Sequence, residues 1–406
     1  MITITPFKAL RPEAQHAKSV ASKPYDVLNS KEAKVEAQGN PNSFLHITKS
    51  EIDLADNIDI HSQEVYDKAK ENLKAFISRN ILFQENKPCY YLYRLIRNGK
   101  SQTGIVCCSS VEDYEKGLIK KHEFTRPEKE LDRINHMKTI KAQTGNVFMA
   151  YRSNHVIDEL VAKWTAEKNP QYNFVADDGV QHSIWIISDD GTIHSITNSF
   201  KALVPATYIA DGHHRAASAA KVNAAIGTKN AAYFLTTLFP DSQLEILDYN
   251  RVVKDLNGHT TEELLENLKT NFSVEKQSKP FKPSQEKTFG LYVDKQWYKL
   301  TAKENSFKND PVGVLDISII QENFLAPLLG IADQRTDKRI DFIGGIRGLE
   351  ALEERVNSGE MALALSFYPV SIEQLLTIAD SGQVMPPKST WFEPKLRDGL
   401  LTHLID

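Results

Sequence analysis

Apolar and polar residues alternate along the chain with two periods, one typical of strands and one typical of helices. Residues 61–80 carry apolar side chains near helical spacing and predict one amphipathic helix. Residues 89–97 and 101–111 predict two strands, joined by a type I′ turn at Asn98-Gly99. Short strands that alternate with helices in this way are typical of α/β or α+β proteins with mixed sheets.

The rest of the chain continues the same alternation. Further strands are predicted at 43–48, 146–152, 182–188, 191–197, 231–240, 244–253 and, as a hairpin, 288–302. Residues 207–227 predict a strand, a turn and a helix, with Gly227 near the helix end. Residues 260–272 predict a helix. Thr260 or Thr261 can cap it, and the glutamates in its first turn suit the positive end of the helix dipole. Residues 316–330 predict another helix.

The length of 406 residues suggests two or three domains, or one large domain with subdomains. We divide the chain into an N-terminal α/β domain, residues 1–240, and a C-terminal α/β domain, residues 241–406. The N-terminal domain contains the turn at 211–215. The C-terminal domain is expected to close a cleft over that turn.

Composition narrows the classes of function. The 49 basic and 53 acidic residues give a net charge of −4, without the basic surface typical of dedicated nucleic-acid binders. Cys89, Cys107 and Cys108 are odd in number and lack the spacing of metal ligands, which argues against a disulfide framework and a zinc site, so we interpret them as structural. The first residues lack the pattern of a secretion signal, and no apolar run is long enough to cross a membrane. We therefore expect a cytoplasmic protein.

The densest group of chemically active residues is the turn in "YIADGHHRAASAA", residues 208–220. The first N–H groups of a helix lack partners within that helix and favour an anion, and Gly212 lets the backbone turn sharply. Arg215 can hold a phosphate with two hydrogen bonds. Asp211 can cap the helix, hold a magnesium ion or accept a proton. His213 and His214 are neighbours and point in different directions, so we expect at most one of them to contact the ligand.

A second group lies in "KKHEFTRPEKELDRINHMK", residues 120–138. Thr125 is expected to cap a helix that has Pro127 near its first position. His122 and Glu123 precede this cap, where loop residues reach into clefts, and Arg126 directly follows it. Arg133 and His136 lie on the helix and can equally serve its packing.

Two further loops are candidates for binding a substrate. Asp26 lies on a proline turn, where an aromatic residue and an acid can line a pocket or only fix the loop. Lys388, Ser389 and Thr390 follow a Pro-Pro pair and precede Trp391, so a rigid loop displays an ammonium group and two hydroxyl groups. The chain contains neither a Walker-type loop nor a GxGxxG or GxSxG motif.

These stretches together resemble one bacterial family that was long known only as a domain of unknown function. The resemblance runs from near residue 5 to the C-terminus and includes "KHEFTRPEKELDR", "YIADGHHRAASAA", "LDYNRVVKDLNG", "TDKRIDFIGGIRGLEALE" and "VMPPKSTWFEPKLRDGL". The turn also resembles the phosphate-binding turn of the ParB/sulfiredoxin-like superfamily, to which archaeal-type free-serine kinases belong.

The resemblance implies a role for each residue of the turn. Asp211 takes the place of the aspartate that acts in phosphoryl transfer, and Gly212, His213, His214 and Arg215 take the phosphate-binding place, with His122 and Arg126 beside them. The kinases also use an upstream glutamate, for which Glu123 is the first choice and Glu13 the second. The implied ligands are ATP or ADP and Mg²⁺, with Asp211 as the metal ligand.

The leading hypothesis is a nucleotide-dependent kinase that phosphorylates free L-serine. Arg126 or Lys388 would anchor the carboxylate of the amino acid, and Asp26 its ammonium group. One alternative is a nucleotide-gated regulatory protein of the ParB type. Another is a metal-dependent phosphatase or other hydrolase that uses His122, Asp211, His213 and His136. The expected partners are a nucleotide and an amino acid. We expect no membrane or nucleic-acid partner. Whether the protein forms a homodimer is left open by the sequence.

Overall fold

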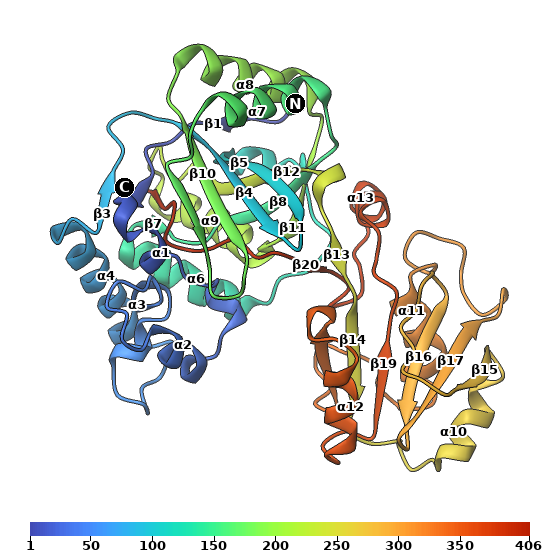
Figure 1. Cartoon of the computed structure of the whole chain (residues 1–406). Coiled ribbons are helices and arrows are strands. Elements are labelled where there is room, and N and C mark those ends of the chain that lie inside the picture. Colours follow the sequence, from blue (N-terminus) through green and yellow to red (C-terminus); the bar gives the residue numbers. More distant parts are fainter. The chain divides into compact units, whose positions relative to one another are not determined.

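The computed structural model describes residues 1–406 and divides the chain into two units (Figure 1). Unit 1 contains residues 1–244 together with residues 394–406, and unit 2 contains residues 245–393. The chain thus leaves unit 1 after residue 244 and returns to it at Pro394. The expected closing of a cleft by the C-terminal part stays a prediction.

Unit 1 is built on a nine-stranded mixed sheet with the order β6-β11-β8-β12-β5-β4-β10-β9, and β1 pairs with β5. The strands are β1 (Ile4–Thr5), β4 (Tyr90–Arg97), β5 (Lys100–Ser110), β6 (Ile119–Lys120), β8 (Val147–Tyr151), β9 (Tyr172–Val175), β10 (Gln181–Ile187), β11 (Thr207–Asp211) and β12 (Tyr233–Pro240). β11 runs parallel to β6, and β12 runs parallel to β8, while the other pairs are antiparallel. The predicted mixed sheet is confirmed.

Helices pack on this sheet and on one another. They are α1 (Ala17–Val20), α2 (Ser30–Ala37), α3 (Leu45–Thr48), α4 (Gln63–Ser78), α5 (Val111–Glu115), α6 (Pro127–Ile140), α7 (His155–Glu167), α8 (Asp190–Leu203) and α9 (His213–Ile226). The main core joins the central strands to apolar side chains of α7, α8 and α9, among them Ile157, Phe200 and Ala216. Figure 1 shows α7 and α8 side by side. The three cysteines are buried and unpaired, which agrees with a structural role.

Several predicted elements of unit 1 are confirmed. The helix at 61–80 is α4, and the hairpin of β4 and β5 turns at Asn98 and Gly99, both with positive φ. The strand, turn and helix of residues 207–227 are β11 and α9, and Gly227 ends the helix in the left-handed conformation.

Two strand predictions were wrong. Residues 43–48 contain the helix α3, and residues 191–197 lie inside α8, whose first turn Asp189 caps by accepting a hydrogen bond from the backbone of Thr192. Both segments carry β-branched residues, which favour strands locally. Ile196 and Phe200 are nevertheless four positions apart and both buried, so burial of one helical face overrides the local preference.

Unit 2 has its own antiparallel six-stranded sheet, with the order β15-β17-β16-β19-β14-β18. The strands of this sheet are β14 (Tyr249–Val253), β15 (Phe272–Gln277), β16 (Thr288–Val293), β17 (Gln296–Ala302), β18 (Ile340–Gly344) and β19 (Leu363–Ser366). Two further strands of unit 2, β13 (Ile246–Leu247) and β20 (Trp391–Phe392), pair with each other in a separate antiparallel sheet. Its helices are α10 (Thr261–Leu268), α11 (Asp316–Ile320), α12 (Glu350–Asn357) and α13 (Ile372–Asp380). Thr260 caps α10 as predicted, whereas the helix expected at 316–330 changes to a π-turn at Gln321–Leu325.

The C-terminal segment, residues 394–406, is held in unit 1 by pairing with three separate parts of it. Ser22 and Asp398 exchange backbone hydrogen bonds, and so do Leu10 and Thr402. The strand β21 (His403–Leu404) pairs with β7 (Ala142–Gln143). Separately from this segment, β2 (Leu10–Pro12) pairs with β3 (Leu82–Gln84). No helix of the chain combines the length and the apolar character needed to span a membrane.

The fold makes one prediction about sheet packing in unit 1. A Cβ at Gly104 on β5 would lie 2.7 Å from Thr237 Cγ2 and 2.9 Å from the ring of Phe239, both on the adjacent β12. We expect Gly104→Ala to lower the free energy of unfolding by about 1–3 kcal/mol, because these neighbours are buried and must shift. Urea unfolding measures the loss. Ser101→Ala, at the exposed start of the same strand, is the control, and equal stability of both variants would contradict the prediction.

Candidate phosphate-binding site

The turn between β11 and α9 lies at the centre of the candidate site. Gly212 is the residue before the first helical turn and has φ +100°, a conformation that side chains other than hydrogen rarely allow. No side chain caps α9, so Asp211 does not cap the helix. No carboxylate therefore caps the first N–H groups of this 14-residue helix. An anion site requires such N–H groups without a capping side chain.

Arg215 folds back over this glycine. A Cβ at Gly212 would lie 2.9 Å from Arg215 Nε, so a larger residue would displace the guanidinium group. Arg215 Nη1 donates to the carbonyl oxygen of Asn146, and Nη2 lies 3.7 Å from both Asp26 Oδ2 and Asp211 Oδ2. Arg215 Nε is buried without a hydrogen-bond partner. The phosphate-binding role of Arg215 stays a prediction, and its observed partners are two carboxylates and a carbonyl group.

Asp211 is held as an anion by two cations. Its Oδ2 accepts a hydrogen bond from Lys395 Nζ at 3.0 Å and lies 3.7 Å from Arg215. Burial alone would raise the pKa of Asp211, but Lys395 and Arg215 hold it well below its usual range. The sequence analysis missed Lys395, because no local motif connects it to a turn 184 residues earlier.

Asp398 is a second carboxyl group that the sequence analysis missed. It is buried beside Arg215, and its Oδ2 has no hydrogen-bond partner. Burial raises the pKa of Asp398 to about 7, although the charge of Arg215 opposes this shift. Asp398 therefore changes its charge near neutral pH, whereas Asp211 stays ionised.

The two adjacent histidines contact different residues of one loop, residues 121–126. His213 Nε2 accepts the backbone N–H of His122 at 3.4 Å, and the two imidazole rings lie edge to face, 4.5 Å apart. His214 Nε2 accepts the backbone N–H of Arg126 at 3.0 Å. Burial lowers the pKa of His122 to about 4, and it lowers the pKa values of His213 and His214 below their usual value. The rings of His213 and His214 are therefore neutral, and each keeps a nitrogen that can accept. Both histidines thus fix the loop that carries Glu123.

This loop carries the other residues predicted upstream of α6. Glu123 Oε2 lies 3.9 Å from His213 Nδ1, and the Glu123 side chain is 43% exposed. Thr125 does not cap α6, so that prediction was wrong: Arg126 occupies the capping position and Pro127 begins the helix. The hydroxyl of Thr125 instead donates to the carboxylate of the buried Glu130, which also pairs with Lys221.

Predicted residues outside this cluster are placed differently. Glu13 is exposed beside the 3₁₀ turn Ala14–His16, and His136 Nε2 contacts the carbonyl oxygen of Ile47 at 3.0 Å. No group of three or more His, Cys, Asp or Glu side chains is arranged to hold a metal ion. A magnesium ion bound mainly by phosphates needs only one or two carboxylates, so Asp211 still fits that expectation.

The predicted substrate residues are divided between the units. Asp26 belongs to unit 1 and contacts Arg215, whereas Lys388, Ser389 and Thr390 belong to unit 2. Lys388 is exposed and lies 5.6 Å from the ring centre of Tyr249, and Ser389 Oγ donates to the carbonyl oxygen of Pro386 at 2.6 Å. The structure describes each unit by itself, so a common substrate site stays a prediction.

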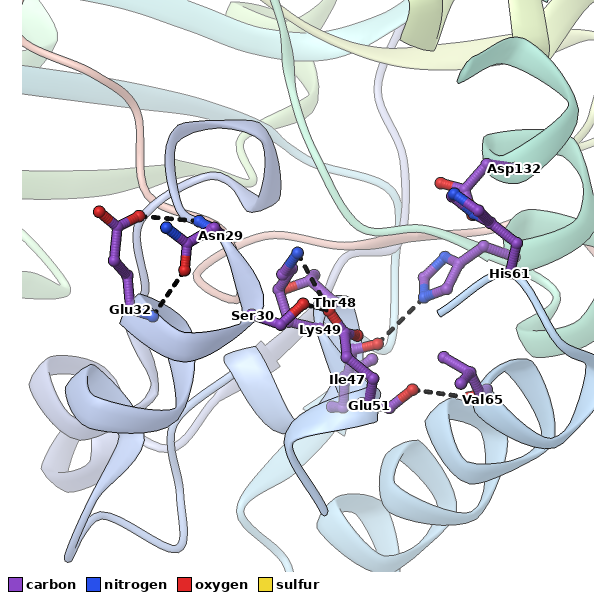
Figure 2. Close-up of polar contacts among 12 residues, drawn as sticks. Asn29, Ser30, Glu32, Ile47, Thr48, Lys49, Glu51, His61, Val65 and Asp132 are labelled. Carbon is purple, nitrogen blue, oxygen red and sulfur yellow. Dashed lines mark hydrogen bonds and ion pairs between the residues drawn. The ribbon is translucent and has the colours of Figure 1, made fainter. Parts of the chain in front are cut away.

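A pocket of about 350 Å³ opens beside the turn in unit 1. Its walls combine aromatic and apolar side chains with several charged ones. Asp26 and His214, which belong to or contact the turn, are among the lining residues. Lys49 Nζ lies 3.0 Å from Glu51 Oε1, which also accepts a hydrogen bond from Ser30 Oγ at 2.8 Å (Figure 2). The pocket is lined by Tyr25, Asp26, Leu28, Thr48, Lys49, Ser50, Glu51, Ile60, His61, Val65, Tyr66, Glu128, Lys129, Asp132, Arg133, His136 and His214.

Asp132, another residue of the pocket lining, contacts several polar side chains. It accepts hydrogen bonds from His61 Nδ1 and Tyr66 Oη, each at 2.9 Å, and it pairs with Arg133. Figure 2 labels Asp132 and His61 near each other at the right of the view, apart from Glu51 and Lys49. The guanidinium group of Arg133 lies 3.9 Å from the ring centre of Tyr25, so the pocket presents an aromatic face and a cation together.

Comparison with known proteins gives one family match. The family model described as "Protein of unknown function (DUF1015)" matches residues 4–318. No curated protein matches the chain.

Some solved structures are similar at low identity. A conserved hypothetical protein from Pyrococcus furiosus is 14% identical, with 73% of this chain and 94% of that chain covered and a TM-score of 0.37. A free serine kinase in complex with AMP is 13% identical, with 72% and 91% covered and a TM-score of 0.36. SbnI with a C-terminal truncation, from Staphylococcus aureus, is 10% identical, with 72% and 85% covered and a TM-score of 0.40.

The site makes a prediction about pH and stability. The pKa of Asp398 is raised in the folded protein, so its stabilising contribution is complete below about pH 4 and is lost as the pH rises through about 7. We expect Asp398→Asn to increase the free energy of unfolding at pH 8 by up to about 4 kcal/mol, and to change it little at pH 4.5. Urea unfolding at both pH values, with the exposed Asp177→Asn as the control, measures this. A destabilised variant at pH 8 would show that the charged carboxylate is needed.

Proposed function

The chain belongs to the family described as "Protein of unknown function (DUF1015)", and we propose that it is a nucleotide-dependent kinase of a small molecule. The proposed acceptor is the hydroxyl group of free L-serine, and the proposed donor is ATP or ADP with Mg²⁺. One observation carries the proposal: an ionised carboxylate, Asp211, lies between two cations at the uncapped N-terminus of a 14-residue helix.

The charges at this turn suit a phosphate group. The N-terminus of α9 supplies backbone donors and the positive end of the helix dipole. Arg215 and Lys395 add two cationic side chains within 3.7 Å of the same carboxylate oxygen. Kinases act mainly by positioning the phosphoryl group and neutralising its charge, so this arrangement fits transfer.

The adjoining pocket suits the rest of a nucleotide. Its volume of about 350 Å³ lies within the range of ligand pockets, and it is larger than free serine requires. Tyr25 contributes aromatic surface to the pocket lining, and Lys49 and Arg133 contribute cations that pair with Glu51 and Asp132. Because Asp26 and His214 are among the residues that line the pocket, a nucleotide bound there would lie next to the turn.

In the proposed reaction the serine hydroxyl oxygen forms a bond to the terminal phosphorus of the nucleotide. The bond between that phosphorus and the bridging oxygen breaks, and the shortened nucleotide leaves with the electron pair. The hydroxyl proton passes to Asp211 or, as the second candidate, to Glu123. A loose transition state needs little help from a base, so the low pKa of Asp211 is compatible with this role. Mg²⁺, held by Asp211, would neutralise phosphate charge.

The proposed anchors of serine carry the required charges. Asp26 would bind the ammonium group, since it lines the pocket and its carboxylate lies 3.7 Å from Arg215 Nη2. Arg126 or Lys388 would bind the carboxylate.

Incubation of the purified protein with Mg²⁺, L-serine and either ATP or ADP tests the proposal. We expect phosphoserine, detected by mass spectrometry. We expect Asp211→Asn to lower turnover at least about 100-fold while the circular dichroism spectrum is kept, because the site loses its central charge. Asp177→Asn, a fully exposed carboxylate of unit 1, is the matched control. Absence of phosphoserine with both nucleotides would refute the serine kinase, and nucleotide binding without turnover would favour a regulatory protein.

A further inference from the structure

Lys395 lies in the stretch "VMPPKSTWFEPKLRDGL", where the sequence analysis assigned it no role, and it reaches the turn from the C-terminal segment. The chain returns from unit 2 to unit 1 at Pro394, and the next residue places its ammonium group 3.0 Å from Asp211 Oδ2. The same segment then places Asp398 beside Arg215. The C-terminal segment therefore contributes two charged groups to a turn whose other members come from residues 26–215.

The position of Lys395 is set by a well-anchored backbone. Asp398, three residues later, exchanges two backbone hydrogen bonds with Ser22, at 2.9 and 3.1 Å. The backbone N–H of Arg397 donates to Tyr93 Oη at 3.2 Å, and Leu396 is buried. Lys395 is thus held at the site by a segment that packs independently of the lysine side chain.

The two cations beside Asp211 differ in accessibility. The Arg215 side chain is 10% exposed, and its Nη1 and Nη2 are engaged by Asn146, Asp26 and Asp211. The side chain of Lys395 is 21% exposed and that of Asp211 is 32% exposed. A ligand at the N-terminus of α9 would therefore meet Lys395 more readily than Arg215. A lysine ammonium on its flexible stem can also change partner without distorting the backbone.

We propose that Lys395 binds the terminal phosphate of the nucleotide, and that it does so by moving from Asp211 to the phosphate oxygens. This inference rests on the proposed nucleotide-binding function. The two positions are close together, because Asp211 lies directly before the helix N-terminus that would receive the phosphate. It also releases Asp211 from one of its two cations at the moment when a phosphate arrives.

Calorimetric titration of the full chain with AMP, ADP and ATP, in the presence of a chelator, tests the exchange. We expect the unmodified protein to bind ADP or ATP more tightly than AMP. Lys395→Gln should reduce that advantage roughly 10- to 100-fold and leave the affinity for AMP nearly unchanged, because one charge-assisted contact to the added phosphate is lost. Lys395→Arg should restore part of the advantage. Lys116→Gln, at an exposed Lys–Glu pair of unit 1, is the matched control.

Asp211→Asn provides the complementary measurement. If Asp211 and the phosphate compete for Lys395, this variant should bind ADP and ATP more tightly than the unmodified protein. The double variant with Lys395→Gln should lose that gain. Unchanged phosphate affinity in Lys395→Gln, with its melting temperature retained, would overturn the inference even if the protein makes phosphoserine.

The remaining outcomes separate this inference from the proposed kinase. Loss of the phosphate advantage in Lys395→Gln, in a protein that forms no phosphoserine, would retain Lys395 as a phosphate-binding residue and refute only the acceptor. Failure of the unmodified protein to bind any of the three nucleotides would overturn both proposals.

Discussion

A buried arginine must have its charge compensated, and this requirement organises the candidate site. Arg215 lies in the first turn of α9, with Asp26, Asp211 and Asp398 around it. Burial alone would lower the pKa of Arg215, but Asp26 and Asp211 raise it, so the guanidinium group stays charged. These carboxylates come from an N-terminal turn, from the end of β11 and from the C-terminal segment. One ionic cluster thus fixes three distant parts of unit 1 around one helix end.

The neutral state of His213 has a different cause from the ionic cluster. Burial, together with the neighbouring His122, keeps the pKa of His213 well below its usual range, although Asp211 opposes this shift. A neutral ring can accept a hydrogen bond, and both His213 and His214 accept backbone N–H groups of the 121–126 loop. Paired histidines after a strand are commonly examined as metal ligands, but here they position a loop.

Local signals were sufficient for part of this structure. The strand β11, its turn and α9 could be predicted because an apolar run, a glycine and an alanine-rich segment follow one another within twenty residues. The strand predicted at 191–197 failed because burial of one face of α8 outweighs the preference of its β-branched residues. Lys395, Asp398 and the pocket around Glu51 and Asp132 could not be found in this way. Their proximity to the turn depends on chain topology, which no local spacing encodes.

The return of the chain to unit 1 has a consequence for protein synthesis. Residues 1–244 contain the whole central sheet and can begin to fold while unit 2 is still being made. Asp211 and Arg215 then lie at the turn without Lys395, Leu396 or Asp398 to cover them. The ion cluster is completed only after residue 398 has been synthesised, about 150 residues after residue 244. Partly synthesised chains therefore lack Lys395 and Asp398 at the turn, so the order of synthesis makes these two residues the last of the cluster to arrive.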